Sequence, residues 1–191
     1  MSGVWPLHRM VPVALALILG AQELFAGYRR RPDADLQDRG SLYLVWALIG
    51  IGYWVAFGLW RGGAPPGPAL GEASMWIGAV LALGGMALRV WSVATLGRYF
   101  TFAVRVTGDQ PVIEAGPYRL IRHPSYAGAL LTAMGIGLSL RYVLAPLIIA
   151  LPAFAGFAVR MSVEERALAD GIGPAYRAYM ARTKRIMPFL Y

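Results

Sequence analysis

Two short polar stretches contain the side chains best suited to chemistry. The first, GPYRLIRHPSYAG, covers 116–128, and the second, RMSVEERAL, begins at Arg160. The apolar stretch between them is too short for a domain of its own, so we expect a hairpin of two membrane crossings. This hairpin would bring Arg160 and Glu164 back beside His123 and Tyr126. We interpret their meeting as an active site.

The first stretch predicts a helix start with binding capacity. A residue before a proline is disfavoured in the helical conformation, so His123 should be extended and Pro124 should open a helix. The first turn, with Ser125 and Tyr126, would present unpaired N–H groups and the positive end of the helix dipole. Such a terminus suits an anionic group, for instance a ligand carboxylate. In the alternative interpretation, Tyr118, His123 and Tyr126 merely lie at the level of the lipid headgroups.

The second stretch places ionisable groups at the end of an apolar segment. Arg160 and Glu164 are one helical turn apart and can project from the same face. Charged groups at such a depth are costly unless paired or functional, and the alternative is snorkelling with an ordinary ion pair. We expect Glu165 to face solvent and Glu23 to lie at the interface. For Arg89 we favour snorkelling over the alternative of a side chain that points into a pocket.

Composition sets the class of protein. Of the 191 residues, 58% are hydrophobic and 15% are charged. Soluble domains carry about 25% charged residues, and a helix of about 20 apolar residues crosses the hydrocarbon core. We therefore expect an all-α, polytopic integral membrane protein with about five transmembrane helices in a single domain, 1–191. The expected spans are about 9–27, 41–60, 74–96, 124–140 and 143–161.

The charged tail after the last span predicts one more element. Proline suits the first position of a helix, so we expect a short amphipathic helix from Pro174 to about Lys184. Tyr176 and Tyr179 would anchor this helix at the membrane surface. Alternatively, Tyr176 could close one side of a pocket.

Charge and cysteine content exclude several classes of function. The net charge is +8, from 18 Lys and Arg against 10 Asp and Glu. Basic residues gather in cytoplasmic loops, and no basic face interleaved with aromatic residues indicates nucleic acid. The distribution of the basic residues predicts that 97–123 and the C-terminus lie in the cytoplasm and that the N-terminus lies outside. Membrane lipids are expected partners of the spans. The absence of cysteine excludes disulfides and thiolates, and two histidines argue against a metal centre.

Three stretches resemble the isoprenylcysteine carboxyl methyltransferase family, which shares its C-terminal half with phospholipid N-methyltransferases. They are LGRYF at 96–100, GPYRLIRHPSYAG at 116–128 and EERAL..GIGPAYRAYMART at 164–183. The resemblance covers about 96–191, and it implies a cofactor-binding half at 97–191. The first two spans carry no signature.

The resemblance implies transfer of a methyl group from S-adenosylmethionine to the carboxylate of an isoprenylcysteine-like or other lipidic substrate at the cytoplasmic membrane face. By motif position, Arg160 would orient the substrate carboxylate. The cofactor would be bound by Arg105, Gln110, Pro111, Val112, Ile113, Tyr118, His123, Pro124, Ser125, Tyr126 and Glu164.

Chemistry and motif details separate carboxyl methylation from the alternative functions. A carboxylate is already ionised at pH 7 and needs no general base, whereas a phospholipid amine must first lose a proton. Membrane reductases that use NADPH typically continue RHPNYFGE, but here Ser125 and Ala129 replace the asparagine and the glutamate. A non-enzymatic membrane scaffold is the remaining alternative.

Overall fold

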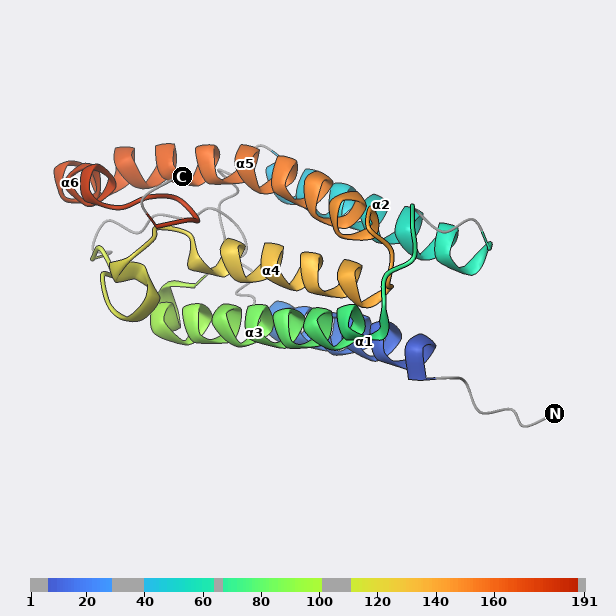
Figure 1. Cartoon of the computed structure of the whole chain (residues 1–191). Helices are drawn as coiled ribbons and strands as arrows, with labels where there is room; N and C mark the ends of the chain where they lie inside the picture. Colours follow the sequence, from blue (N-terminus) through green and yellow to red (C-terminus); the bar gives the residue numbers. More distant parts are fainter. Residues whose placement is uncertain (1–6, 29–39, 64–66, 101–110, 189–191) are drawn as a thin grey trace.

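Helices make up nearly all of the regular structure in the described part of the chain. The computed structural model describes residues 7–28, 40–63, 67–100 and 111–188 (Figure 1). Its α-helices are α1 (Leu7–Tyr28), α2 (Ser41–Arg61), α3 (Glu72–Leu96), α4 (Pro124–Ser139), α5 (Ala145–Gly171) and α6 (Pro174–Arg182). Two 3₁₀ turns, η1 (Gly97–Tyr99) and η2 (Gly116–Arg119), flank the segment that joins α3 to α4.

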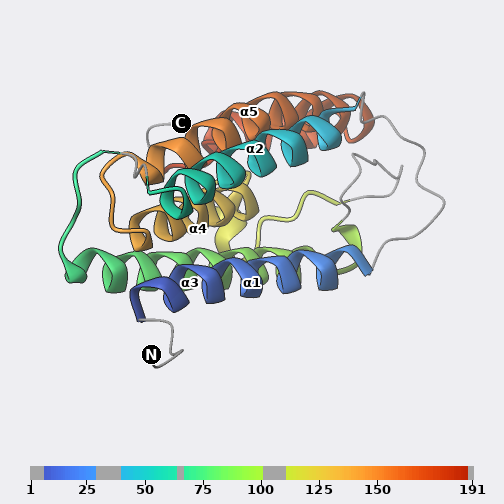
Figure 2. The ribbon, with the colours of Figure 1, turned by 90° about the vertical axis from the view of Figure 1, so that its right-hand side faces the viewer.

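The long helices pack as two pairs with a shorter helix between them. α1 lies along α3, and α2 lies along α5 (Figure 2). α4 packs against both α3 and α5 and so joins the two pairs (Figure 1). The first turn of α4 therefore faces the last turns of α3 and the second half of α5.

Glycines allow α3 and α4 to approach closely. A Cβ atom added at Gly78 or Gly85 would lie 2.5 Å from a backbone oxygen of α4, at Gly135 or Gly128 respectively. Small residues at a helix interface let two backbones come together in a membrane protein. This contact holds α4 against α3 along most of its length and positions the start of α4.

Among the described residues, three helical stretches are long and apolar enough to cross a membrane: Ser41–Arg61, Glu72–Tyr99 and Ala145–Gly171. The all-α membrane fold is thus confirmed, while the number of five spans stays a prediction. α4 has 16 residues, which is shorter than the roughly 20 needed for a full crossing.

The last long helix continues beyond the expected end of the fifth span near Met161. α5 runs through Gly171 as one helix, so Arg160 and Glu164 share it as expected, and the charged turns after Met161 find partners inside the protein. α6 begins at Pro174 as predicted, with proline in its first turn, and it ends at Arg182.

After α6 the chain returns to the start of α4. The Arg122 N–H donates to the Lys184 carbonyl oxygen at 2.7 Å, and the His123 N–H donates to the Arg185 carbonyl oxygen at 2.8 Å. These two hydrogen bonds attach residues 184 and 185 to the segment that leads into α4. The backbone of His123 is therefore held by a segment far away in the sequence.

Candidate active site

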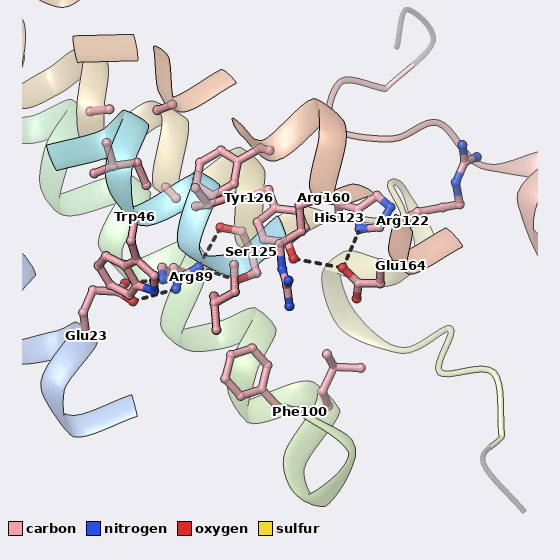
Figure 3. A pocket seen from close by; sticks show the side chains of 18 of the residues that line it. Glu23, Trp46, Arg89, Phe100, Arg122, His123, Ser125, Tyr126, Arg160 and Glu164 are labelled. Carbon is pink, nitrogen blue, oxygen red and sulfur yellow. Dashed lines mark hydrogen bonds and ion pairs between the residues drawn. The ribbon is translucent and has the colours of Figure 1, made fainter. Parts of the chain in front are cut away.

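A cavity of about 1110 Å³ lies between the helix pairs. α1 to α5, the segment after α3 and α6 all contribute to its wall. Ser125 and Tyr126 line it from the first turn of α4, and Arg160 and Glu164 line it from the second half of α5 (Figure 3). Residues farther along the helices, such as Ala133 and Ala153, make the rest of the wall apolar. The cavity therefore has a polar end and an apolar end.

Tyr126 joins the two polar stretches directly. Its hydroxyl donates to Glu164 Oε2 at 2.9 Å, so the first turn of α4 meets the second half of α5 (Figure 3). The Tyr126 ring stacks between the His123 ring, at 5.5 Å between centroids, and the Phe157 ring, at 4.9 Å. The Glu164 side chain remains 31% exposed, so part of its carboxylate is accessible from the cavity.

Arg160 lies one turn before Glu164 and also lines the cavity. It is only 3% exposed, and its Nη1 donates to the hydroxyl of Ser41 at 2.9 Å. Ser41 is the first residue of α2, so this bond attaches the N-terminal half of the chain to the polar end of the cavity. No motif in the sequence singles out Ser41, because the first two spans carry no signature.

Glu165 does not face solvent, and that prediction was wrong. Its side chain is 4% exposed and accepts hydrogen bonds from Arg122 Nε at 2.9 Å and from Arg185 Nη2 at 2.7 Å. His123 Nε2 lies 3.1 Å from the same carboxylate. A buried charge is tolerated when it is paired and hydrogen-bonded. The cationic partners therefore explain why the chain can bury this glutamate.

His123 lies between the two carboxylates. Its Nε2 meets Glu165 Oε1, while its Nδ1 lies 3.9 Å from Glu164 Oε2. With a proton on Nε2, His123 would donate a hydrogen bond to Glu165 Oε1, and this bond would fix the orientation of the ring. His123 caps α4, and Pro124 is buried as the first residue of that helix. Pro124 is absent from the cavity wall, so its evident contribution is to start the helix.

Arg89 points into the protein, so the favoured snorkelling interpretation was wrong and the pocket alternative was right. Its Nε and Nη2 donate to the two Glu23 oxygens at 2.6 and 2.8 Å, and its Nη1 donates to Ser125 Oγ at 2.8 Å (Figure 3). All three residues line the cavity. Glu23 is therefore an internal ion-pair partner and not an interfacial group.

Three tyrosines outside the expected membrane spans complete the polar wall. Tyr118, Tyr176 and Tyr179 are buried, and the Tyr179 hydroxyl donates to the Tyr118 carbonyl oxygen at 2.7 Å. Burial raises the pKa of Tyr179 to about 12. Burial also raises the pKa values of Tyr118 and Tyr176 above their ordinary range. All three phenols are thus neutral near pH 7, and Tyr176 closes one side of the cavity, as its alternative interpretation predicted.

Most of the remaining residues predicted for the site also line the cavity. Those lining it are Pro111, Val112, Ile113, Tyr118, His123, Ser125, Tyr126, Arg160 and Glu164. Arg105 and Gln110 lie outside the described residues. The structure thus brings together side chains from the two motif stretches and from the segment before α4.

The comparison with known families matches this architecture. The sequence profile of the isoprenylcysteine carboxyl methyltransferase (ICMT) family matches residues 76–170, which include α4, Arg160 and Glu164. The chain belongs to the ICMT family. The matched range excludes α1 and α2, although Glu23 and Ser41 from those helices hydrogen-bond residues inside it.

Two plant relatives and one solved structure are similar to this member of the ICMT family. A probable protein-S-isoprenylcysteine O-methyltransferase of Oryza sativa subsp. japonica is 32% identical over 117 residues, 60% of this chain and 61% of the relative. Protein-S-isoprenylcysteine O-methyltransferase B of Arabidopsis thaliana is 29% identical over 120 residues, 60% and 61% of the respective chains. The match thus spans about three fifths of the length of these relatives.

The solved structure of a eukaryotic intramembrane Ras methyltransferase, ICMT, is similar with a TM-score of 0.63. It is 24% identical and the match covers 75% of this chain and 52% of that chain. At this level of identity, the likeness concerns the fold.

Proposed function

We propose that this ICMT-family protein transfers a methyl group from S-adenosylmethionine to the carboxylate of an isoprenylcysteine-like or other lipidic substrate. The observation that carries the proposal is one continuous cavity, with Arg160, Glu164 and Tyr126 at its polar end and an apolar wall beyond. The names of the plant relatives support the same reaction. The distribution of basic residues supports a cytoplasmic location for the polar end, with the N-terminus outside.

The residues at the polar end fit the proposed cofactor. S-adenosylmethionine would supply a methyl group that is activated by a positively charged sulfur. The partly exposed Glu164 carboxylate suits the ammonium group of such a molecule, and the ring of Tyr118 suits its cationic sulfur. The segment from Pro111 to Ile113 also lines the cavity and would add backbone contacts.

Arg160 would orient the substrate. Its guanidinium cannot deprotonate and offers a planar set of donors that matches a carboxylate. Arg160 lines the cavity one turn before Glu164, so an acceptor carboxylate bound to it would lie beside the proposed cofactor contacts. Alignment of reacting groups in a site that excludes water can lower a barrier by about 7 kcal/mol or more. Positioning by the protein is thus the main source of catalysis in this proposal.

The need for a base separates a carboxylate from an amine as the acceptor. A carboxylate is ionised at pH 7 and attacks without losing a proton. A phospholipid amine must first give a proton to a base, and the buried phenols of Tyr118, Tyr176 and Tyr179 stay protonated and do not accept it. Glu164 would have to accept that proton, and methylation of an amine is therefore kept as the alternative.

The apolar end suits a lipid chain. Leu19 of α1, Ile49 and Phe57 of α2, and Ala153 of α5 line it. Burying hydrocarbon against such walls contributes about 25 cal/mol for each Å² removed from water. A substrate anchored by its carboxylate at Arg160 would therefore be held along its hydrocarbon tail as well.

The decisive experiment supplies purified protein in detergent with labelled S-adenosylmethionine and either a farnesylcysteine analogue or phosphatidylethanolamine. We expect label in the carboxyl ester of the cysteine analogue. Label that appears only in the phospholipid would overturn the choice of acceptor. Binding of NADPH without binding of S-adenosylmethionine would overturn the proposed class of enzyme.

A further inference from the structure

An ion pair in the cavity wall connects three helices. Glu23 of α1 accepts hydrogen bonds from Arg89 Nε at 2.6 Å and from Arg89 Nη2 at 2.8 Å. The remaining nitrogen of this guanidinium, Nη1, donates to Ser125 Oγ at 2.8 Å and lies 3.4 Å from the Ser125 carbonyl oxygen. Ser125 is the second residue of α4. Arg89 therefore links α1 to the first turn of α4 (Figure 3).

Stability alone does not explain this ion pair. Arg89 is 8% exposed, and the side chain of Glu23 is 14% exposed. Removing two charges from water costs about as much as their attraction returns, and apolar residues in their place often give an equally stable protein. Charged residues inside apolar helices are rare and usually serve a function. The pair therefore has a reason to exist beyond holding α1 against α3.

The contact with Ser125 supplies that reason. The next residue, Tyr126, donates its hydroxyl to Glu164, and all three residues line the cavity. α3 and α4 are also in backbone contact at this level, since a Cβ atom added at Gly128 would lie 2.9 Å from the Arg89 backbone nitrogen. The Arg89 guanidinium thus fixes the first turn of α4 from its α3 side.

Glu23 determines how the guanidinium is oriented. Its two oxygens engage Nε and Nη2 of Arg89, and such a bidentate pair fixes the plane of the arginine. With that plane fixed, Nη1 is directed at Ser125. A residue of α1, outside the range that the family profile matches, therefore acts on the start of α4.

We propose that Glu23 and Arg89 are positioning residues, which set the affinity of the cavity for the methyl donor by fixing the first turn of α4 through Ser125. The inference rests on the proposed function and adds α1 to the machinery that binds the cofactor. Without these contacts, Tyr126 would be free to shift relative to Glu164, and the cofactor would meet a less ordered wall.

The test measures the dissociation constant of S-adenosylmethionine by isothermal titration with the full-length protein in detergent. Arg89→Lys keeps a positive charge beside Glu23, but an ammonium group lacks the fork that reaches both Glu23 and Ser125. The double variant Glu23→Gln with Arg89→Met removes both charges together, so neither is left buried without its partner. We expect the dissociation constant to rise about tenfold in both variants, as for the loss of one hydrogen bond to a charged group.

Gln22→Ala is the matched control. Gln22 precedes Glu23 on α1, and its Nε2 donates to the Met86 carbonyl oxygen of α3 at 3.5 Å. The change thus removes a polar contact between the same two helices that does not involve Arg89. The dissociation constant of this variant should equal that of the unmodified protein.

A merely structural ion pair would give a different result. It would lower the unfolding midpoint and the fraction of protein that binds, but the folded fraction would keep the dissociation constant of the unmodified protein. That outcome in the two Arg89 variants would overturn the inference and leave the proposed function standing.

Hydrogen exchange of residues 124–128 supplies a measurement that needs no ligand. We expect faster exchange there in Arg89→Lys than in Gln22→Ala, and equal exchange would count against positioning of α4 by Arg89. Faster exchange in a protein that does not bind S-adenosylmethionine even when unmodified would instead overturn the proposed function.

Discussion

Two consecutive glutamates lie in opposite surroundings. Glu164 lines the cavity, is 31% exposed and accepts a hydrogen bond from Tyr126. Glu165 is 4% exposed and is enclosed by Arg122, Arg185 and His123. Neighbouring residues on a helix point about 100° apart, so one turn of α5 serves both the cavity and the protein interior. Identical side chains thus acquire different roles from their partners.

The two glutamates are coupled through His123. Glu165 contacts the His123 ring, and the Arg185 carbonyl oxygen accepts a hydrogen bond from the His123 N–H. The His123 ring stacks on the Tyr126 ring, and the Tyr126 hydroxyl donates to Glu164. The buried Glu165 carboxylate therefore helps to position the part of the cavity wall that contains the accessible Glu164 carboxylate. Loss of Glu165 should act on stability first, and loss of Glu164 should act on ligand binding first.

The largest expected effect follows Glu165→Ala. The change leaves Arg122 and Arg185 without their buried partner, and removal of one member of a buried ion pair lowers the free energy of unfolding by about 3–5 kcal/mol. Chemical denaturation in detergent measures this loss. Glu164→Ala is the matched control and should lower stability by about 1 kcal/mol or less, because Glu164 is partly solvated. Equal losses for both variants would refute the distinction.

Arg160→Lys should have the next largest effect, on turnover. Lysine keeps the positive charge but loses the planar donors, so methyl transfer should slow by about a hundredfold while the cofactor still binds. Ser41→Ala is the control, since it removes only the partner of Arg160 Nη1 and should cost much less. A variant that turns over normally with lysine at position 160 would contradict the proposed orientation of the substrate.

Glu164→Gln sharpens the contrast on the cavity side. It keeps the shape and removes the charge that would bind the cofactor ammonium, so affinity for S-adenosylmethionine should fall about tenfold to a hundredfold. Isothermal titration measures the affinity, and the unfolding midpoint should hardly move. Unchanged affinity would remove Glu164 from the cofactor site.

The smallest expected effect is a flat pH profile. With an ionised acceptor and neutral tyrosines, the rate of the chemical step should stay constant from about pH 7 to pH 9. A tenfold rise in rate per pH unit near neutrality would instead indicate an amine acceptor.

The stability of the protein should respond to Tyr179 only in alkaline solution. The pKa of Tyr179 is about 12 in the folded protein, above its ordinary value near 10. The unfolded chain therefore loses this proton first, and the contribution of Tyr179 to stability should fall only between about pH 10 and 12.

Local patterns predicted the parts of the structure that depend on neighbouring residues. The apolar stretches marked the long helices, and Pro124 and Pro174 marked two helix starts. The approach of Glu164 to Tyr126 was expected from a short hairpin of two apolar segments between the two polar stretches.

Pairings between distant segments could not be predicted in the same way. The burial of Glu165 depends on the register that places Arg185 beside His123, and no local pattern encodes that register. Arg89 was misjudged for the same reason, since its partner Glu23 belongs to a helix without any signature.

The pairing of residues 184 and 185 with Arg122 and His123 has a consequence for biosynthesis. Translation produces α1 to α6 before it produces these two residues, so every helix can insert while His123 still lacks its backbone acceptor. A chain that stopped after Thr183 would hold α1 to α6 but lack both hydrogen bonds at the start of α4. The first turn of α4 therefore gains these backbone partners only after all the described helices have been translated.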